Sequence, residues 1–195
     1  MKKLDAIKNW IKEGSKILVL GCGSGELLNV LIKENKVKGF GIDIDEKKVF
    51  QAISQGLSVI QGDFNTDLSD YPEKSFDYVV AHDVIQITNK PNQTLKQCLK
   101  IGNKVIVSFP NFAYLKIRLT ILLSGRMPKT KILPYEWYDT PNIHLFTTKD
   151  FKELCAKEKI QIMSERYTGV GKKEIPRLLI PNTFAEFAYF LISSP

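Results

Sequence analysis

Apolar residues in the first 110 positions alternate between short continuous runs and stretches with a helical period. Short apolar runs bounded by turn residues are typical of buried strands, and a period of three to four residues is typical of amphipathic helices. The expected strands are residues 16–20, 40–44, 57–60, 76–81 and 105–109. The expected helices are residues 4–11, a helix resuming at Leu27, residues 46–54 and residues 91–100. This alternation predicts a parallel sheet with helices on both faces.

The pattern changes after Pro110. Residues 112–123 read as a helix with a broad apolar surface, and residues 124–146 contain many prolines and aromatic residues but few regular signals. A helix over 148–159 and two closing strands, 160–167 and 184–192, follow. We therefore expect a single domain over residues 1–195, with a lid or interface insertion at about 111–146.

Composition and charge narrow the class of protein. The chain has 195 residues, of which 44% are apolar and 25% are charged, as in ordinary soluble domains. Charges interrupt the N-terminal segment where a signal peptide would be apolar, and no apolar run is long enough to span a membrane. We expect a soluble, cytoplasmic protein without membrane contact.

Cysteine and lysine placement exclude two further classes. Cys22, Cys98 and Cys155 are odd in number and widely separated, so they predict buried free thiols and neither a disulfide framework nor a metal site. The net charge of +7 comes from lysines spread along the whole chain. A solvated surface explains that distribution better than a nucleic-acid partner does.

A glycine loop follows the first expected strand. Gly21, Gly23 and Gly25 lie between a strand and a helix, where missing side chains let a ligand approach the backbone. A dinucleotide fingerprint would place its third glycine at position 26, which is Glu26. A carboxylate there repels a pyrophosphate but is compatible with S-adenosylmethionine, which carries a cationic sulfonium and no phosphate.

Acidic residues follow the next two expected strands. Asp43 lies 22 positions beyond Gly21, where an acidic side chain can accept hydrogen bonds from ribose hydroxyls. Asp45 is interpreted as a helix cap instead. Asp63 is placed to meet an adenine amino group, with Phe64 covering the ring; the alternative is a turn residue before Asn65.

These runs resemble class I S-adenosylmethionine-dependent methyltransferases. The resemblance rests on residues 19–25, 41–45, 61–63 and 75–80. It implies a doubly wound α/β fold, a mostly parallel seven-stranded sheet whose last strand is antiparallel, and S-adenosylmethionine or S-adenosylhomocysteine as cofactor. The expected cofactor residues are Gly21, Cys22, Gly23, Gly25, Asp43, Ile44, Gly62, Asp63, Phe64 and His82.

The second half carries a narrower resemblance. Residues 108–112, 125–128 and 133–145 resemble the MetW family of methionine biosynthesis, and the similarity covers roughly residues 14–168. The resemblance implies a methyltransferase fold that works with a homoserine O-acyltransferase. Whether that enzyme uses acetyl or succinyl groups is left open.

Two histidines are the candidate catalytic residues. Methyl transfer needs alignment of donor and acceptor and often a base. His82 follows the fourth expected strand and His144 lies in the aromatic segment, so either is a candidate base; a structural role is the alternative for both. Asp83 is adjacent to His82, but alternation along a strand points the two side chains apart. An enzyme that methylates a small molecule at oxygen or nitrogen is the alternative to a regulatory binding protein.

Overall fold

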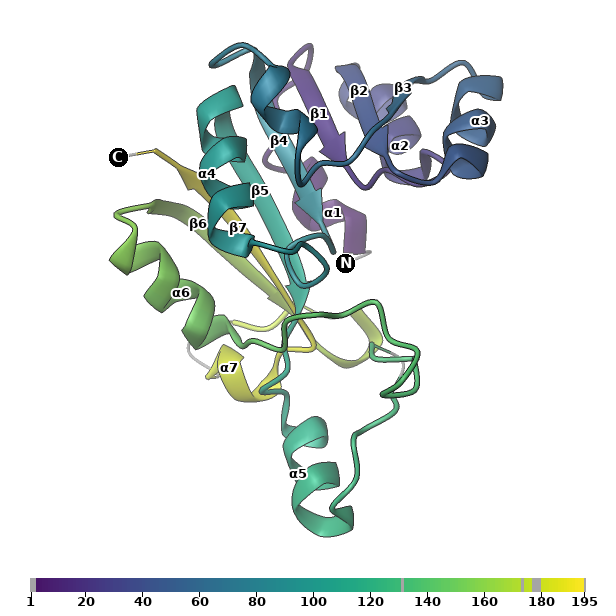
Figure 1. The fold of residues 1–195 in the computed structure, drawn as a ribbon. Coiled ribbons are helices and arrows are strands. Elements are labelled where there is room, and N and C mark those ends of the chain that lie inside the picture. The colour runs from purple at the N-terminus through teal and green to yellow at the C-terminus, as the bar shows by residue number, and fades with distance from the viewer. Residues whose placement is uncertain (1–2, 131, 173, 177–179, 195) are drawn as a thin grey trace.

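The computed structural model describes residues 3–130, 132–172, 174–176 and 180–194, which form one seven-stranded sheet (Figure 1). The strand order is β3-β2-β1-β4-β5-β7-β6. All pairs up to β5 are parallel, whereas β7 is antiparallel to both β5 and β6. The strands are β1 (Lys16–Leu20), β2 (Lys38–Asp43), β3 (Ser58–Gln61), β4 (Phe76–His82), β5 (Gly102–Pro110), β6 (Gln161–Thr168) and β7 (Phe187–Ser193).

Helices cover both faces of this sheet. The α-helices are α1 (Lys3–Lys8), α2 (Glu26–Asn35), α3 (Glu46–Ser54), α4 (Pro91–Ile101), α5 (Leu115–Ser124), α6 (Thr148–Lys157) and α7 (Pro181–Phe184). Buried side chains of α1, α2 and α3 pack in one apolar cluster, and those of α4 and α6 pack in a second. The fold is therefore the doubly wound α/β arrangement that the sequence predicts, including its antiparallel end.

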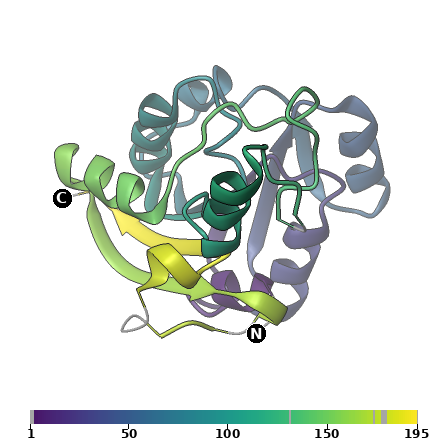
Figure 2. The ribbon, with the colours of Figure 1, turned by 90° about the horizontal axis from the view of Figure 1, so that it is seen from below.

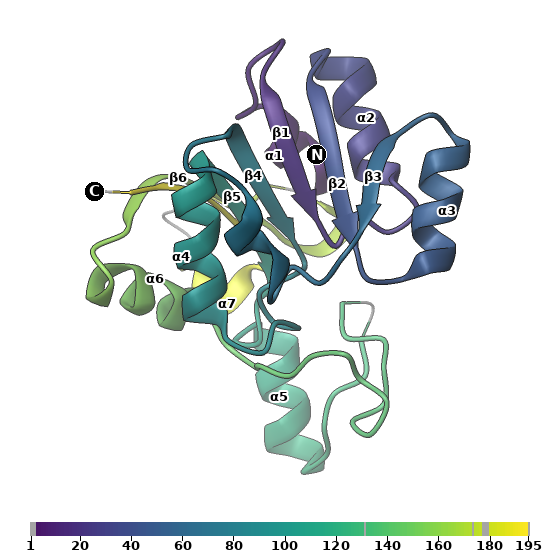
Figure 3. The ribbon, with the colours of Figure 1, turned by 45° about the horizontal axis from the view of Figure 1, so that its top comes forward.

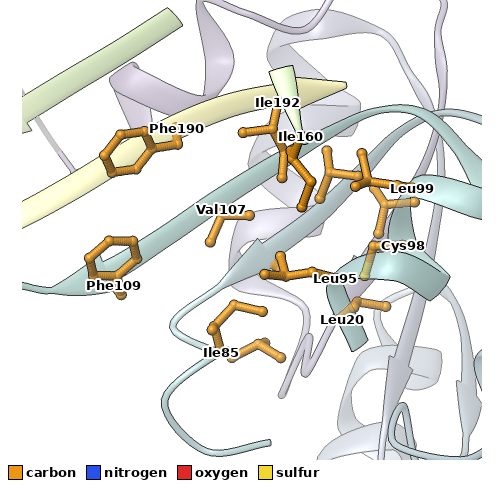
Figure 4. Packing of buried hydrophobic residues seen from close by; sticks show 14 of the residues in the cluster. Leu20, Ile85, Leu95, Cys98, Leu99, Val107, Phe109, Ile160, Phe190 and Ile192 are labelled. Carbon is orange, nitrogen blue, oxygen red and sulfur yellow. The ribbon is translucent and has the colours of Figure 1, made fainter. Parts of the chain in front are cut away.

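Apolar side chains from both sheet and helices fill the two clusters. Figure 4 shows part of the second cluster, to which Val107 and Phe109 of β5 and Leu95 and Cys98 of α4 all belong. Strands that are buried on both faces need apolar residues at nearly every position. In β5, for example, the six residues from Val105 to Pro110 are all buried.

Two expected elements differ from the structure. Phe184 ends the short helix α7, so the expected strand over 184–192 is wrong at its start, and β7 begins at Phe187. Pro181 occupies the first turn of α7, where its missing N–H costs nothing. The helix expected from residue 112 begins at Leu115, because Asn111 organises a turn: its Oδ1 accepts from Ala113 N, and its backbone oxygen accepts from Tyr114 N.

The thiols are buried, as expected. Burial raises the pKa of Cys22 to about 11, with the charge of Asp43 adding to the effect. Burial likewise raises the pKa of Cys98 and of Cys155 to about 12. Within the described residues, no helix combines the length and the apolar character needed to cross a membrane.

The chain between β5 and α6 stands apart from the layers. Figure 3 shows the arrowheads of β1, β2 and β4 pointing toward α5 and the segment that follows it. We call residues 125–146 the aromatic segment. Seen from below, α5 projects toward the viewer and the aromatic segment loops beside it (Figure 2). Both therefore lie at the carboxyl edge of the sheet, where open α/β sheets bind ligands.

Candidate functional site

The glycine loop joins the end of β1 to the start of α2. Gly21, Gly23 and Gly25 have φ values of +56°, +56° and +86°, a region that side chains disfavour. At Gly25 an added Cβ would also lie 2.2 Å from Cδ1 of Leu57, so Leu57 would have to move. The loop conformation therefore depends on these glycines.

Asp43 holds this loop in place from the neighbouring strand. Its side chain is buried at the end of β2. Oδ2 accepts a hydrogen bond from Gly23 N at 2.6 Å, and Oδ1 accepts one from Asp45 N at 3.0 Å. One carboxylate thus connects the glycine loop to the turn that begins α3.

Asp45 serves the helix and not the loop. It is the N-cap of α3, and its side chain accepts from the backbone N–H groups of Lys47 and Lys48. Hydrogen bonds from the N-terminus of a helix stabilise the ionised form, so the bond from Lys48 lowers the pKa of Asp45. Its interpretation as a cap is confirmed.

A cavity of about 360 Å³ opens beside the loop. Its volume lies within the usual range of small-molecule sites. At Gly23 an added Cβ would meet no atom nearer than Cδ of Lys48 at 4.0 Å, so this glycine faces the open space. The lining residues are Leu4, Val19, Leu20, Gly21, Cys22, Gly23, Ser24, Glu26, Leu27, Lys48 and His82.

The turn after β3 lies against the same strand end. Gly62 N donates to the backbone oxygen of Asp43 at 3.0 Å. Asp63 Oδ1 accepts from Asn65 N at 2.8 Å and from Asn65 Nδ2 at 2.7 Å. This is the turn role left open by the sequence, and it occupies one carboxylate oxygen; contact of Asp63 with adenine stays a prediction.

Phe64 and Ile44 lie near the glycine loop but do not line this cavity. Cε1 of Phe64 lies 3.8 Å from the position that a Cβ on Gly21 would take, so the ring packs against the glycine loop. Ile44 follows Asp43 and is 63% exposed, although it is a large apolar side chain. An apolar side chain at this edge suits the face of a purine ring.

His82 contacts the cavity from the tip of β4. Its Nδ1 lies 2.5 Å from Oγ of Ser108, the residue directly opposite on β5. Asp83 adopts a left-handed conformation with φ of +56°, which breaks strand alternation. As a result, Oδ2 of Asp83 lies 3.8 Å from Nε2 of His82. The expectation that these side chains point apart is therefore wrong.

His144 lies in the aromatic segment, which is hydrogen-bonded to the loop after β4. Its backbone N donates to the oxygen of Gln86 at 3.0 Å, and Ile143 N donates to that oxygen at 2.8 Å. Nε2 of His144 and Oε1 of Gln86 are buried and make no hydrogen bond within the described part of the chain. His144 does not line the cavity that His82 lines, and a catalytic role for either stays a prediction.

Several residues that build this site were not among those expected from the sequence. Leu4, Glu26 and Lys48 line the cavity, and Ser108 holds the ring of His82. Glu26 and Lys48 lie in the first turns of helices that follow the first two strands, a position that points to the carboxyl edge. Leu4 and Ser108 reach the site through tertiary packing and strand pairing, for which one sequence gives no local signal.

This fold is that of class I S-adenosylmethionine-dependent methyltransferases. It superposes on a methyltransferase of Thermotoga maritima described as a possible histamine N-methyltransferase, with a TM-score of 0.69 and 17% identity. The alignment covers 98% of this chain and 87% of that one. The chain itself belongs to the MetW family, because the family model for methionine biosynthesis protein MetW matches residues 2–192.

Curated relatives are longer than this chain. A bifunctional methionine biosynthesis protein MetXA/MetW of Rhodopirellula baltica is 29% identical over 177 residues, which are 86% of this chain and 28% of the relative. A ribosomal protein L11 methyltransferase of Dictyoglomus turgidum is 34% identical over 110 residues, 54% of this chain and 36% of that protein. The chain spans about a third of the length of these relatives.

Proposed function

We propose that this protein binds S-adenosylmethionine or S-adenosylhomocysteine in the cavity beside the glycine loop. The observation that carries this proposal is Gly23: it has a positive φ, it faces the cavity, and its N–H is tied to Asp43. A side chain at this position would enter the space meant for the ligand. Glu26 lines the cavity, and its carboxylate suits a ligand with cationic groups better than a phosphate.

Other residues would each contact a different part of the ligand. Asp43 would accept from the ribose hydroxyls with lone pairs that its two backbone hydrogen bonds leave free, while Ile44 and Phe64 would flank the purine ring. Cys22 and Gly21 would border the ligand through their backbone. When bound, S-adenosylmethionine supplies an electrophilic methyl group on a sulfonium.

The proposal includes a protein partner, a homoserine O-acyltransferase of methionine biosynthesis. The MetW relative of Rhodopirellula baltica carries a MetXA unit in the same chain, which supports association of the two activities. Fusion places two units at high effective concentration and favours a docked pair. The three buried free thiols are compatible with work in the reducing cytoplasm.

The test measures the rate of the homoserine O-acyltransferase from the same organism under four conditions. Protein and S-adenosylmethionine are each present or absent. We expect a several-fold rise on addition of the protein, and a further change in either direction when the cofactor is present. No change in rate together with no complex in sedimentation would contradict the partnership.

A second function, methylation of a small-molecule oxygen or nitrogen, is favoured by one observation. His82 lines the cofactor cavity with its ring held by Ser108, so its Nε2 is oriented near the carboxyl edge. Turnover of labelled methyl donor with cell metabolites, lost in His82→Gln with cofactor binding retained, would support it.

A further inference from the structure

The helix α5 carries apolar residues on more than one side, and most of them are exposed. Of its ten residues, only Ile117 is buried. Leu122 and Leu123 are 78% and 81% exposed, and Leu119 and Ile121 are exposed as well. The apolar face of a helix is normally buried against a core. Figure 1 shows α5 projecting away from the sheet instead, so the rest of the described chain does not cover it.

The aromatic segment, which follows this helix in the chain, adds a second group of exposed apolar side chains. Trp137 and Tyr138 are each 73% exposed, and their rings contact edge to face with centroids 5.5 Å apart. Met127, three residues after the end of α5, is also exposed. Two such aromatic side chains alone leave roughly 300 Å² uncovered, about the lower end of the largest apolar patches on typical monomers. Trp and Tyr are also enriched among residues that dominate binding energy.

Cationic groups border the helix. Lys116, Arg118 and Arg126 are exposed on α5 or directly after it. A second copy of this chain docked through the same face would bring these like charges together, which is unfavourable. A partner with an apolar groove and an acidic border fits the surface better.

We propose that α5, Met127, Trp137 and Tyr138 form the docking surface for the homoserine O-acyltransferase. This assignment rests on the proposed function, which identifies the partner protein; the exposed residues of the structure identify the surface. The surface, which we call the α5 surface, stands at the carboxyl edge of the sheet, the edge where the cofactor cavity opens. Its apolar side chains would fill a groove on the partner, and its cations would meet the acidic border.

The test compares binding of the purified acyltransferase to three forms of the full-length chain. The first is the unchanged protein and the second carries Leu122→Ser and Leu123→Ser. The third is a control with Phe50→Ser and Ile53→Ser on α3, which are 72% and 52% exposed and lie away from α5. We expect the α5 pair to weaken binding at least about 30-fold, the effect of losing a hot spot, and the control to change it less than twofold. S-adenosylmethionine affinity should be equal in all three.

Each other outcome separates the surface from the partnership. If the unchanged protein and the α5 variant bind the acyltransferase equally well, the α5 surface is not the docking surface, but the two proteins are still partners. Failure of the unchanged protein to bind overturns the partnership, and the surface with it. Self-association, or binding to anionic lipid vesicles, that the α5 pair abolishes would show a different occupant and also overturn the proposal. If the α5 pair does not fold, Trp137→Ala with Tyr138→Ala decides by the same criteria.

Discussion

Replacing Asp43 by Asn tests whether this carboxylate organises the glycine loop. The buried carboxylate accepts from Gly23 N at 2.6 Å and from Asp45 N at 3.0 Å. An amide has one oxygen, so Asn can accept only one of these bonds well and must turn its NH₂ toward the other N–H. Hydrogen bonds to charged groups contribute about 1.5–3 kcal/mol, and an unsatisfied buried donor costs about 1–3 kcal/mol. We expect the free energy of unfolding to fall by about 1–3 kcal/mol on these grounds.

Urea unfolding followed by tryptophan fluorescence measures this change, with an unchanged m-value as the sign that only stability moved. Asp45→Asn is the matched control, because it removes the same charge two residues away. Asn caps helices as well as Asp does, so the control should stay close to the unchanged protein. We also expect Asp43→Asn to raise the Kd for S-adenosylmethionine at least about tenfold, and the control to leave it unaltered. Equal stability and equal Kd for the two variants would refute the role assigned to Asp43.

Three further changes probe the site and the fold. Gly23→Ala should lower the free energy of unfolding by about 1–2 kcal/mol, the cost of a left-handed side chain, and abolish cofactor binding detected by calorimetry; binding at unchanged affinity would contradict the position assigned to the ligand. The buried thiols, with the pKa of Cys22 raised to about 11, should react with iodoacetamide at pH 7.5 far more slowly in the folded than in the urea-unfolded protein, as mass spectrometry can follow; equal rates would contradict their burial. Hydrogen bonds from Lys96 and Asn92 lower the pKa of Glu158. The contribution of this carboxylate to the free energy of unfolding is therefore complete above about pH 4.5 and is lost as the pH falls below that value. Glu158→Gln should lose less stability on acidification than the unchanged protein, and an identical pH profile of the two would exclude this role.

The layout of the sheet was predictable because its determinants are local. Apolar runs specify β1, β4 and β5, and the glycines and Asp43 follow strands whose carboxyl ends must meet at one edge. Asp45 was predictable for the same reason, since a cap acts within three residues of its helix. The start of β7 was not predictable from apolar period alone. Phe184 is apolar in either element, and only the position of Pro181 indicates a helix there.

Parts of the site depend on contacts that no local pattern encodes. His82 is held by Ser108, 26 residues away, through the pairing of β4 with β5. The angle between His82 and Asp83 depends on a positive φ at Asp83, which alternation along a strand does not anticipate. Leu4 reaches the cavity because α1 packs on the layer that contains α2. Tertiary packing therefore determines which side chains line the site, whereas the sequence pattern predicts only the strands and loops that surround it.

The cofactor cavity and the α5 surface are connected through the loop after β4. The aromatic segment is tied to the loop after β4 by two hydrogen bonds to the oxygen of Gln86, four residues beyond His82. A ligand that displaces His82 can therefore shift the segment that supplies part of the α5 surface. By linkage, if cofactor changes the affinity for the acyltransferase by some factor, the acyltransferase must change the affinity for cofactor by the same factor, commonly about 5- to 150-fold. Calorimetric titration of each ligand with and without the other measures both factors. A stable complex in which both factors equal one would show that the two sites are independent, and that the shared carboxyl edge brings them close without coupling them.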